Sequence, residues 1–406
     1  MIKVGIDIGN SKISSIVCDI KNDGSKKILS FISKPTTNVK KSFITNLFSI
    51  KNEILSIINE TAKESQTKIK SINLNIPAVD SLSIFSNTEI QVAGEMITNL
   101  HLKKAINNSD FFETLTDYEV MQKFIVNYKL DDKIYYTNPS NNFGNILSLN
   151  FYKFAVKKNY VNTLIKLFND ININIENLIP TPLSSALATL NSDDKNLGAI
   201  CIDLGDSSSS IAMFENNKLI FLDAIKIGSR NITNDIARGI STNIKSAERL
   251  KNLHGSVISS PSDEHELIEV PYLSSDPSNF KQINRNDINS IIKPRVEETL
   301  EMIWQKLKQY GLNKKKIKNL ILTGGGSQLE GITDYAQIIF DSNVRLGKTN
   351  SINGLNVSFL KPQFSQTIGT ILYDKADYQV DFLKNSEKIK NSSFFSQFSA
   401  WLDQYI

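Results

Sequence analysis

Two short segments of the chain place an aspartate and a glycine at the end of an apolar run. In VGIDIGNSK they are Asp7 and Gly9, and in AICIDLGDSSSS they are Asp203 and Gly205. A tight turn of this kind aims several backbone N–H groups at one point and so favours an anion. Two such turns would grip a polyphosphate from both sides, with the two carboxylates holding a hydrated Mg2+ and Lys12 adding a positive charge. One Asp-x-Gly turn by itself is equally consistent with unrelated hairpins.

A third segment, LTGGGSQLEG, has three glycines at the end of an apolar strand. They are Gly324, Gly325 and Gly326. Residues without side chains let the backbone approach a flat ligand closely. A glycine loop alone carries little weight, but its place after two Asp-x-Gly turns favours a nucleotide site.

The elements around these motifs follow one order twice. Residues 4–8 and 13–20 read as strands around a turn, and apolar residues from 43 to 58 recur at helical spacing. The second half repeats strand, turn, strand, strand and helix, and a long helix is predicted over 295–310. The pattern predicts an α/β protein with two similar halves.

Composition limits the class of protein. A chain of 406 residues predicts two or more domains, and a net charge of +4 gives no case for nucleic-acid binding. Cys18 and Cys201 lie in apolar runs away from any histidine, so we expect buried thiols. No apolar run approaches the ~20 residues that span a bilayer. Because the chain also starts directly in a strand, we expect no signal peptide and a cytoplasmic location.

The motifs resemble the actin/Hsp70/sugar-kinase superfamily and, within it, the FtsA family of bacterial division proteins. GIDIGNSK resembles the first phosphate loop, DLGDSSSSIAMF occupies the second, and LTGGGSQLEGI resembles the adenosine loop. NPSNNFGN before LSLNFYKFAV resembles the end of the family's inserted subdomain, and GSRNITNDIA and SAERLKNLHG resemble the segments after the second loop. The resemblance covers nearly the whole chain and implies a two-lobed, actin-like (ribonuclease-H-like) fold.

The resemblance also implies a domain order. We expect a first lobe at 1–81 and 156–198, an FtsA-type inserted subdomain at 82–155, a second lobe at 199–237 and 315–373, a small subdomain at 238–314, a linker at 374–391 and an amphipathic helix at 392–406.

ATP with Mg2+ is the ligand that the resemblance implies. Asp7 and Asp203 would hold the Mg2+ largely through water, while Glu248 and Lys251 would reach the ribose and adenine. The implied nucleotide-binding residues are Asp7, Gly9, Asn10, Ser11, Lys12, Asp203, Gly205, Ser207, Ser208, Glu248, Lys251, Gly324, Gly325, Gly326 and Ser327.

The second phosphate loop departs from the family pattern, which is rich in glycine and ends in an aspartate. Asp206 and Ser207 stand where glycines would be, and Ser210 replaces the last Asp. A carboxylate near a phosphate is repulsive unless Mg2+ lies between them, although serine hydroxyls still donate to phosphate. We therefore expect nucleotide binding with slow or absent hydrolysis.

The C-terminal segment FFSQFSAWLDQYI predicts an amphipathic helix. Its apolar face comprises Phe394, Phe395, Phe398, Trp401, Leu402 and Tyr405. Docking on the protein's own core is the usual fate of such a helix, but a polar stretch from about 374 to 393 separates it from the lobes. The helix is too short to cross a bilayer and can lie in its interface. It resembles the family's membrane-targeting helix. The lysines of this C-terminal region all lie before the helix, so we expect anchoring to rest on apolar burial.

The function that the resemblance implies is mechanical. The protein would tether FtsZ polymers to the cytoplasmic face of the inner membrane at the division site, self-assemble and recruit later division proteins. The acidic, apolar C-terminal peptide of FtsZ would bind the small subdomain, and the candidate residues are Lys281, Arg285, Arg295 and Glu298. Two alternatives stay open: an adaptor of the pilus-assembly type and a small-molecule kinase of the same superfamily.

Overall fold

The first half of the chain builds a five-stranded sheet. The structure, a computed structural model, describes residues 1–108, 115–273, 279–312, 318–349 and 352–375. The strand order is β11-β6-β1-β2-β3. The strands are β1 (Ile2–Ile8), β2 (Lys12–Ile20), β3 (Lys26–Pro35), β6 (Ser71–Ile76) and β11 (Asn174–Pro180). β1 is antiparallel to β2 and parallel to β6, and its Val4 and Ile6 are buried in the core.

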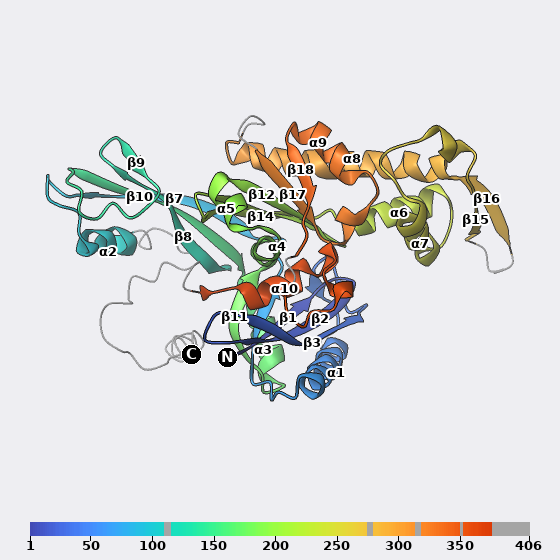
Figure 1. Ribbon diagram of the computed structural model, residues 1–406, viewed down its shortest axis with the longest axis horizontal. Coiled ribbons are helices and arrows are strands. Elements are labelled where there is room, and N and C mark those ends of the chain that lie inside the picture. The colour runs from blue at the N-terminus through green and yellow to red at the C-terminus, as the bar shows by residue number, and fades with distance from the viewer. Residues whose placement is uncertain (109–114, 274–278, 313–317, 350–351, 376–406) are drawn as a thin grey trace.

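The second half builds a sheet of the same design. Its order is β14-β13-β12-β17-β18, with an antiparallel meander on one side of β12 and parallel strands on the other. The strands are β12 (Ala199–Leu204), β13 (Ser209–Glu215), β14 (Lys218–Ile225), β17 (Asn319–Thr323) and β18 (Asn343–Leu346). The predicted α/β class with two similar halves is confirmed, and Figure 1 shows the two sheets one above the other.

Two helices connect the halves. Helix α4 (Thr181–Thr189) follows a strand of the first sheet but contacts β12 and β13 of the second. Helix α10 (Ser365–Leu372) follows the second sheet but contacts β1 and β2 of the first. The two helices approach so closely that a Cβ at Gly369 would collide with the carbonyl of Ser184. This crossing fixes how the two sheets face each other.

An inserted four-stranded sheet lies to one side of both halves (Figure 1). Its order is β7-β10-β8-β9. The elements are β7 (Leu82–Gln91), α2 (Asn99–Asn108), β8 (Tyr118–Leu130), β9 (Lys133–Tyr135) and β10 (Ile146–Lys157). The Leu222 amide of β14 donates to the Tyr152 hydroxyl of β10 at 2.8 Å, which attaches the insertion to the second sheet. The predicted boundary at 155 falls inside β10, because β10 continues its pairing with β8 as far as Lys157.

A helical region with a short hairpin lies on the opposite side. Its elements are α6 (Ser229–Gly239), α7 (Ile244–His254), η1 (Pro261–Glu264), β15 (Leu267–Pro271), β16 (Phe280–Asn284) and α8 (Arg285–Gln309). The predicted boundary between 237 and 238 falls inside α6, whose apolar face runs through it.

The helix predicted over 295–310 is longer at its start. Helix α8 begins at Arg285, where the Asn284 side chain accepts a hydrogen bond from the Asp287 amide. It passes through Pro294 because buried residues on both sides of the proline, Ile292 and Val296, keep one face against the core. Helix interiors seldom hold proline, which explains why the predicted helix started only after Pro294, at Arg295.

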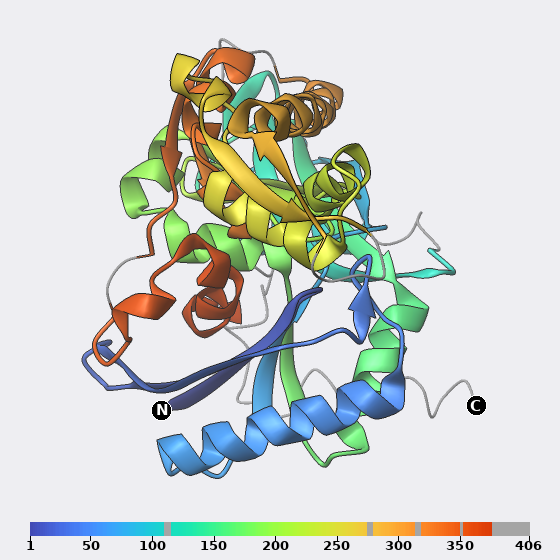
Figure 2. The ribbon, with the colours of Figure 1, turned by 90° about the vertical axis from the view of Figure 1, so that its right-hand side faces the viewer.

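The remaining elements are helices and a separate two-stranded sheet, β4-β5. They are β4 (Val39–Lys40), β5 (Phe43–Ile44), α1 (Leu47–Ser65), α3 (Lys158–Asn169), α5 (Ser192–Leu197), η3 (Gly325–Gln328), α9 (Ile332–Phe340), η4 (Val357–Phe359) and η5 (Pro362–Phe364). Helix α1 lies along the first sheet (Figure 2) and begins at Leu47, since Phe43 pairs in β5 instead.

Cys18 and Cys201 are buried free thiols, as predicted. Within the ranges described, no helix is long and apolar enough to cross a membrane.

Candidate functional site

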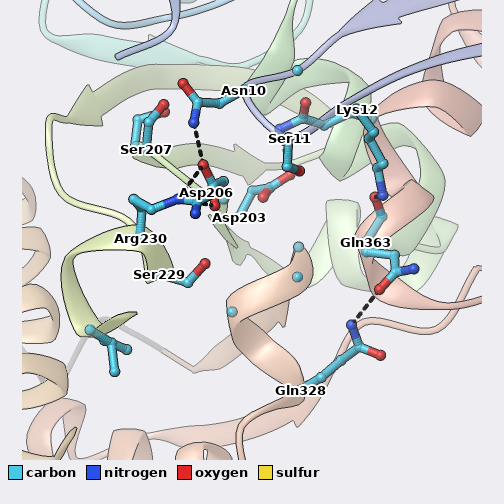
Figure 3. A pocket seen from close by; sticks show the side chains of 18 of the residues that line it. Asn10, Ser11, Lys12, Asp203, Asp206, Ser207, Ser229, Arg230, Gln328 and Gln363 are labelled. Atoms are coloured by element: carbon cyan, nitrogen blue, oxygen red, sulfur yellow. Dashed lines mark hydrogen bonds and ion pairs between the residues drawn. The ribbon is translucent and has the colours of Figure 1, made fainter. Parts of the chain in front are cut away.

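A cleft of about 720 Å3 is lined by residues from both five-stranded halves (Figure 3). It brings together Asp7, Gly9, Asn10, Ser11, Lys12, Asp203, Gly205, Ser207, Ser208, Glu248, Lys251, Gly324, Gly325 and Gly326. Ser327 was also predicted to bind the nucleotide, but its side chain is buried behind the glycine loop. Its hydroxyl donates to the Gly324 carbonyl at 2.8 Å. Its place indicates a structural part in closing that loop.

The two Asp-x-Gly turns have the same backbone geometry. The Gly9 amide donates to the Lys12 carbonyl at 2.9 Å, and the Gly205 amide donates to the Ser208 carbonyl at 3.0 Å. A Cβ would lie 3.1 Å from the acceptor oxygen at Gly9 and 2.8 Å at Gly205. A side chain is therefore opposed sterically at Gly205, and at Gly9 it would be crowded by the equivalent carbonyl.

The two aspartates are buried where their strands end. Asn75 donates to the Asp7 carboxylate at 3.1 Å, and burial raises the pKa of Asp7 from 3.8 to about 6. Ser185 and Gln366 donate to Oδ2 of Asp203, whose pKa burial also raises. The other carboxylate oxygen of Asp203 is buried and has no hydrogen-bond partner among the described residues. An acceptor oxygen left without a donor fits a hydrated cation.

Lys12 lies beside both aspartates. Its Nζ donates to the Gln363 carbonyl at 2.7 Å and lies 3.8 Å from the centre of the Phe364 ring. Burial lowers the pKa of Lys12 from 10.5 to about 8, against the attraction of Asp7 and Asp203. The amine thus links β2 to the segment before α10. Among the described residues, no group of three or more His, Cys, Asp or Glu side chains is placed to hold a metal, so a cation here would need phosphate and water oxygens as well.

A buried lysine, Lys251, and a partly exposed carboxylate, Glu248, form an ion pair at another part of the cleft wall. The Lys251 amine donates to Glu248 at 2.9 Å and to the Thr233 hydroxyl at 3.0 Å. Burial by itself raises the pKa of Glu248, but Lys251 and Thr233 outweigh it, so this pKa lies below its ordinary value. The Glu248 carboxylate therefore offers a hydrogen-bond acceptor at the cleft.

The glycine loop supports Asp203 from behind. Gly324 has a φ of +84°, and a Cβ there would collide with Oδ1 of Asp203 and lie 2.6 Å from the Leu204 carbonyl. At Gly325 a Cβ would meet only Gln363, at 3.9 Å. Gly324 is therefore required by the backbone, whereas Gly325 leaves open space in the cleft wall.

The structure adds cleft residues that the sequence reading did not single out. Arg230, at the start of α6, forms an ion pair with Asp206, and the Ser42 hydroxyl contacts that of Ser207 at 3.0 Å. Asn75 and Gln366 hold the aspartates. Asn75 could have been found from the sequence, because it is a polar amide within an apolar strand. No local sequence feature distinguishes Ser42.

The residues predicted to bind an FtsZ peptide are already engaged within the fold. Arg285 forms ion pairs with Asp263, Glu266 and Glu330. Arg295 pairs with Asp235 of α6 and with Glu298, while Lys281 donates to the Ile240 carbonyl. An acidic peptide would have to compete with these contacts. The predicted membrane residues Phe394, Phe395, Phe398, Trp401, Leu402 and Tyr405 lie outside the described residues.

Comparison with known sequences finds similarity to the cell division protein FtsA. The sequence model of the family described as "Cell division protein FtsA" matches residues 200–369. The cell division protein FtsA of Rhizobium meliloti is 27% identical over 98% of this chain and 93% of its own length. That of Agrobacterium fabrum is 29% identical over 84% of this chain and 78% of its own, and that of Escherichia coli K12 is 24% identical over 98% and 97%.

The chain is similar to proteins of the FtsA family along nearly its whole length. Solved structures similar to this chain share its actin-like fold. The PilM-PilN type IV pilus biogenesis complex aligns with a TM-score of 0.63 at 14% identity, over 91% of this chain and 97% of that chain. MreB5 of Spiroplasma citri bound to ADP aligns with a TM-score of 0.55 at 12% identity, over 92% and 96%. The predicted two-lobed, actin-like fold is confirmed.

Proposed function

We propose that this chain binds ATP with Mg2+ in the cleft between its two halves. The observation that carries the proposal is the pair of matching turns with buried Asp7 and Asp203 on one cleft, where an oxygen of Asp203 lacks a donor. The turns offer backbone N–H groups to phosphates, and the two carboxylates fit a hydrated cation. The bound cation would neutralise the phosphates. The MreB5 structures named for ADP and AMPPNP have the same fold, which supports the choice of ligand class.

We propose further that the nucleotide-bound protein self-assembles and tethers FtsZ polymers to the cytoplasmic face of the inner membrane at the division site, where it recruits later division proteins. The FtsA relatives that match along nearly the whole chain support this role. The similar fold of a MamK double helical filament, with a TM-score of 0.53, supports assembly into filaments. ATP hydrolysis would be slow or absent, because the second loop lacks the usual glycines and final aspartate.

A vesicle co-sedimentation assay tests the tether. The full chain should carry FtsZ polymers down with vesicles, and a chain that ends at residue 391 should leave them in the supernatant. Trp401→Glu should have the same effect, because it places a charge within the apolar face of the helix. Both variants should keep their thermal midpoint and ATP binding. Co-sedimentation by the shortened chain would contradict the tether, and a sharply lowered midpoint would place the helix in the core instead.

The FtsZ peptide site is tested by a pair of substitutions that break one ion pair from opposite ends. Arg295→Gln removes the cation, whereas Asp235→Asn frees it from its internal partner. If Arg295 holds a peptide carboxylate, the first variant should weaken FtsZ-peptide binding and the second should strengthen it in a fluorescence polarisation assay. Equal weakening in both variants would show that the ion pair only holds α6 against α8.

A further inference from the structure

The side chain of Asp206 lies between the two turns and touches both sides of the cleft (Figure 3). Its Oδ2 accepts a hydrogen bond from the Asn10 amide of the first turn. Its carboxylate also pairs with Nε of Arg230, at 3.3 Å for Oδ1 and 3.4 Å for Oδ2. The Asp206 carboxylate therefore engages a neutral donor of one half, Asn10, and a cation of the other half, Arg230.

The backbone holds Asp206 in this place. The Arg230 amide donates to the Asp206 carbonyl at 2.7 Å, which ties the second turn to the start of α6. A Cβ at Gly228 would lie 2.6 Å from that same carbonyl, so the chain passes very close to the turn. The side chain cannot leave its neighbourhood without moving the turn, although it can rotate away from Asn10.

A second contact ties the same turn to the first half. The Ser42 hydroxyl lies 3.0 Å from that of Ser207 and 3.4 Å from that of Ser208. Ser42 adopts a φ of 68°, a backbone conformation that non-glycine residues seldom take. The serine-rich turn is thus held across the cleft on two sides, by Ser42 and by Asn10.

Asn10 and Arg230 are the kinds of group that bind a phosphate oxygen, and both line the cleft. The buried Oδ1 of Asn10 has no hydrogen-bond partner among the described residues, so the amide lies where it is mainly through its contact with Asp206. A further phosphate on the ligand would compete for the same two donors. It would also be repelled by the carboxylate at short range, since two like charges close together in a partly buried site interact strongly.

We propose that Asp206 acts as an internal substitute for the terminal phosphate and makes the cleft distinguish nucleoside diphosphate from nucleoside triphosphate. The inference rests on the proposed nucleotide site. A diphosphate leaves Asp206 bridging Asn10 and Arg230. A triphosphate displaces the carboxylate, and its terminal phosphate takes over the bond from Asn10 and the charge of Arg230. The second turn therefore responds to the length of the phosphate chain.

The test measures the affinities of ADP and ATP for the full chain by competition with a fluorescent nucleotide in the presence of Mg2+. Asp206→Asn removes the charge while keeping the size, and should raise the affinity for ATP relative to ADP by about tenfold or more. Arg230→Gln should lower the affinity for ATP and leave that for ADP nearly unchanged. Asp223→Asn is the matched control, since that carboxylate pairs with Lys306 and does not line the cleft. It should leave the ratio unchanged.

Each outcome decides the proposal. An unchanged ratio of ATP to ADP affinity in Asp206→Asn overturns this inference but leaves the nucleotide site in place. A loss of ATP affinity that added Mg2+ restores makes Asp206 a metal ligand and also overturns it. If neither nucleotide binds the parent or any variant, the proposed function fails together with the inference. Should Asp206→Asn fold poorly, Asp206→Ser also removes the charge, and serine is the residue type that follows it in the turn.

Discussion

The first and second Asp-x-Gly turns share a backbone and differ in their side chains. Each follows the first strand of a three-stranded meander, places a buried aspartate at that strand's end and closes with one glycine amide. The first turn then presents donors, Asn10 and Lys12. The second presents an acceptor, Asp206, and hydroxyl groups.

This difference makes the two turns complementary. If the two turns carried the same side chains, each would present the same donors or acceptors to the other. A shared ligand would then be needed to join them. Here Asn10 of the first turn donates to Asp206, so the two turns contact each other directly. Ser42, between β4 and β5, also contacts Ser207 and ties the second turn to the first half. We infer that the repeated topology provides two phosphate-sized turns, and that side-chain divergence provides contacts across the cleft.

The largest expected effect tests the glycine loop, which supports only the second turn. Gly325→Arg should lower ATP affinity by about a hundredfold or more, ~2.7 kcal/mol, because a long side chain enters open space at the cleft wall. The parent thermal midpoint should be kept. Calorimetry with ATP and Mg2+ measures the affinity. Binding as tight as that of the parent would show that the ligand does not reach this loop.

Gly324→Ala is the contrasting variant at the neighbouring position. It should destabilise the fold by about 1–3 kcal/mol, because the positive φ and the collision with Asp203 both oppose a Cβ. Urea unfolding measures the loss. A midpoint equal to that of the parent would mean that the loop does not hold Asp203 in place.

The next effect concerns Asp7, the buried aspartate of the first turn. Asp7→Asn should raise the free energy of unfolding of the nucleotide-free protein by roughly 1–3 kcal/mol at pH 7.5, because it removes an ionised group that burial disfavours. Urea unfolding in EDTA measures this change. The same variant should lose the Mg2+ dependence of ATP binding. A loss of stability would show that the pairing of Asp7 with Lys12 outweighs its burial.

The pH dependence of stability follows from the same group. The pKa of Asp7 in the folded protein, about 6, lies above its ordinary 3.8, so the folded state binds more protons between these values. The contribution of Asp7 to stability is present at low pH and is lost as the pH rises through about 6. The parent should therefore gain stability relative to Asp7→Asn between pH 7 and pH 5 in EDTA. A constant difference between the two proteins would contradict the raised pKa.

The smallest expected effect concerns the serine contact. Ser42→Ala should destabilise the nucleotide-free protein by about 0.5–1.5 kcal/mol and let the halves separate more readily. Ser33→Ala is its control, since it removes a Ser–Ser contact of 2.9 Å within the first sheet. Fluorescence energy transfer between dyes on the two halves measures the separation. The comparison of the two turns would be weakened if both variants changed the transfer equally.

The sequence by itself determined the repeated design. Alternating apolar strands, a glycine at each turn and an aspartate before it are local features, because strand period and turn chemistry depend on neighbouring residues. They sufficed to predict two similar α/β halves and the buried thiols, and they marked the aspartates and glycines of the cleft. Glu248 and Lys251 were implied by the family resemblance instead. Local reasoning placed the start of α8 at Arg295, whereas the helix begins at Arg285. The domain boundaries implied by the resemblance fall inside β10 and α6, since packing carries these elements past the point where their local pattern changes.

Only the tertiary structure decided which side chains meet across the cleft. Asn10 and Asp206 lie 196 positions apart in the chain, and Ser42 and Ser207 lie 165 apart. Their contacts depend on how α4 and α10 cross between the sheets, which is a matter of helix packing. The sequence predicted that the charge of Asp206 opposes a phosphate. The structure adds that Asn10 and Arg230 contact this carboxylate, and these partners could not be predicted because they are set by its neighbours in space.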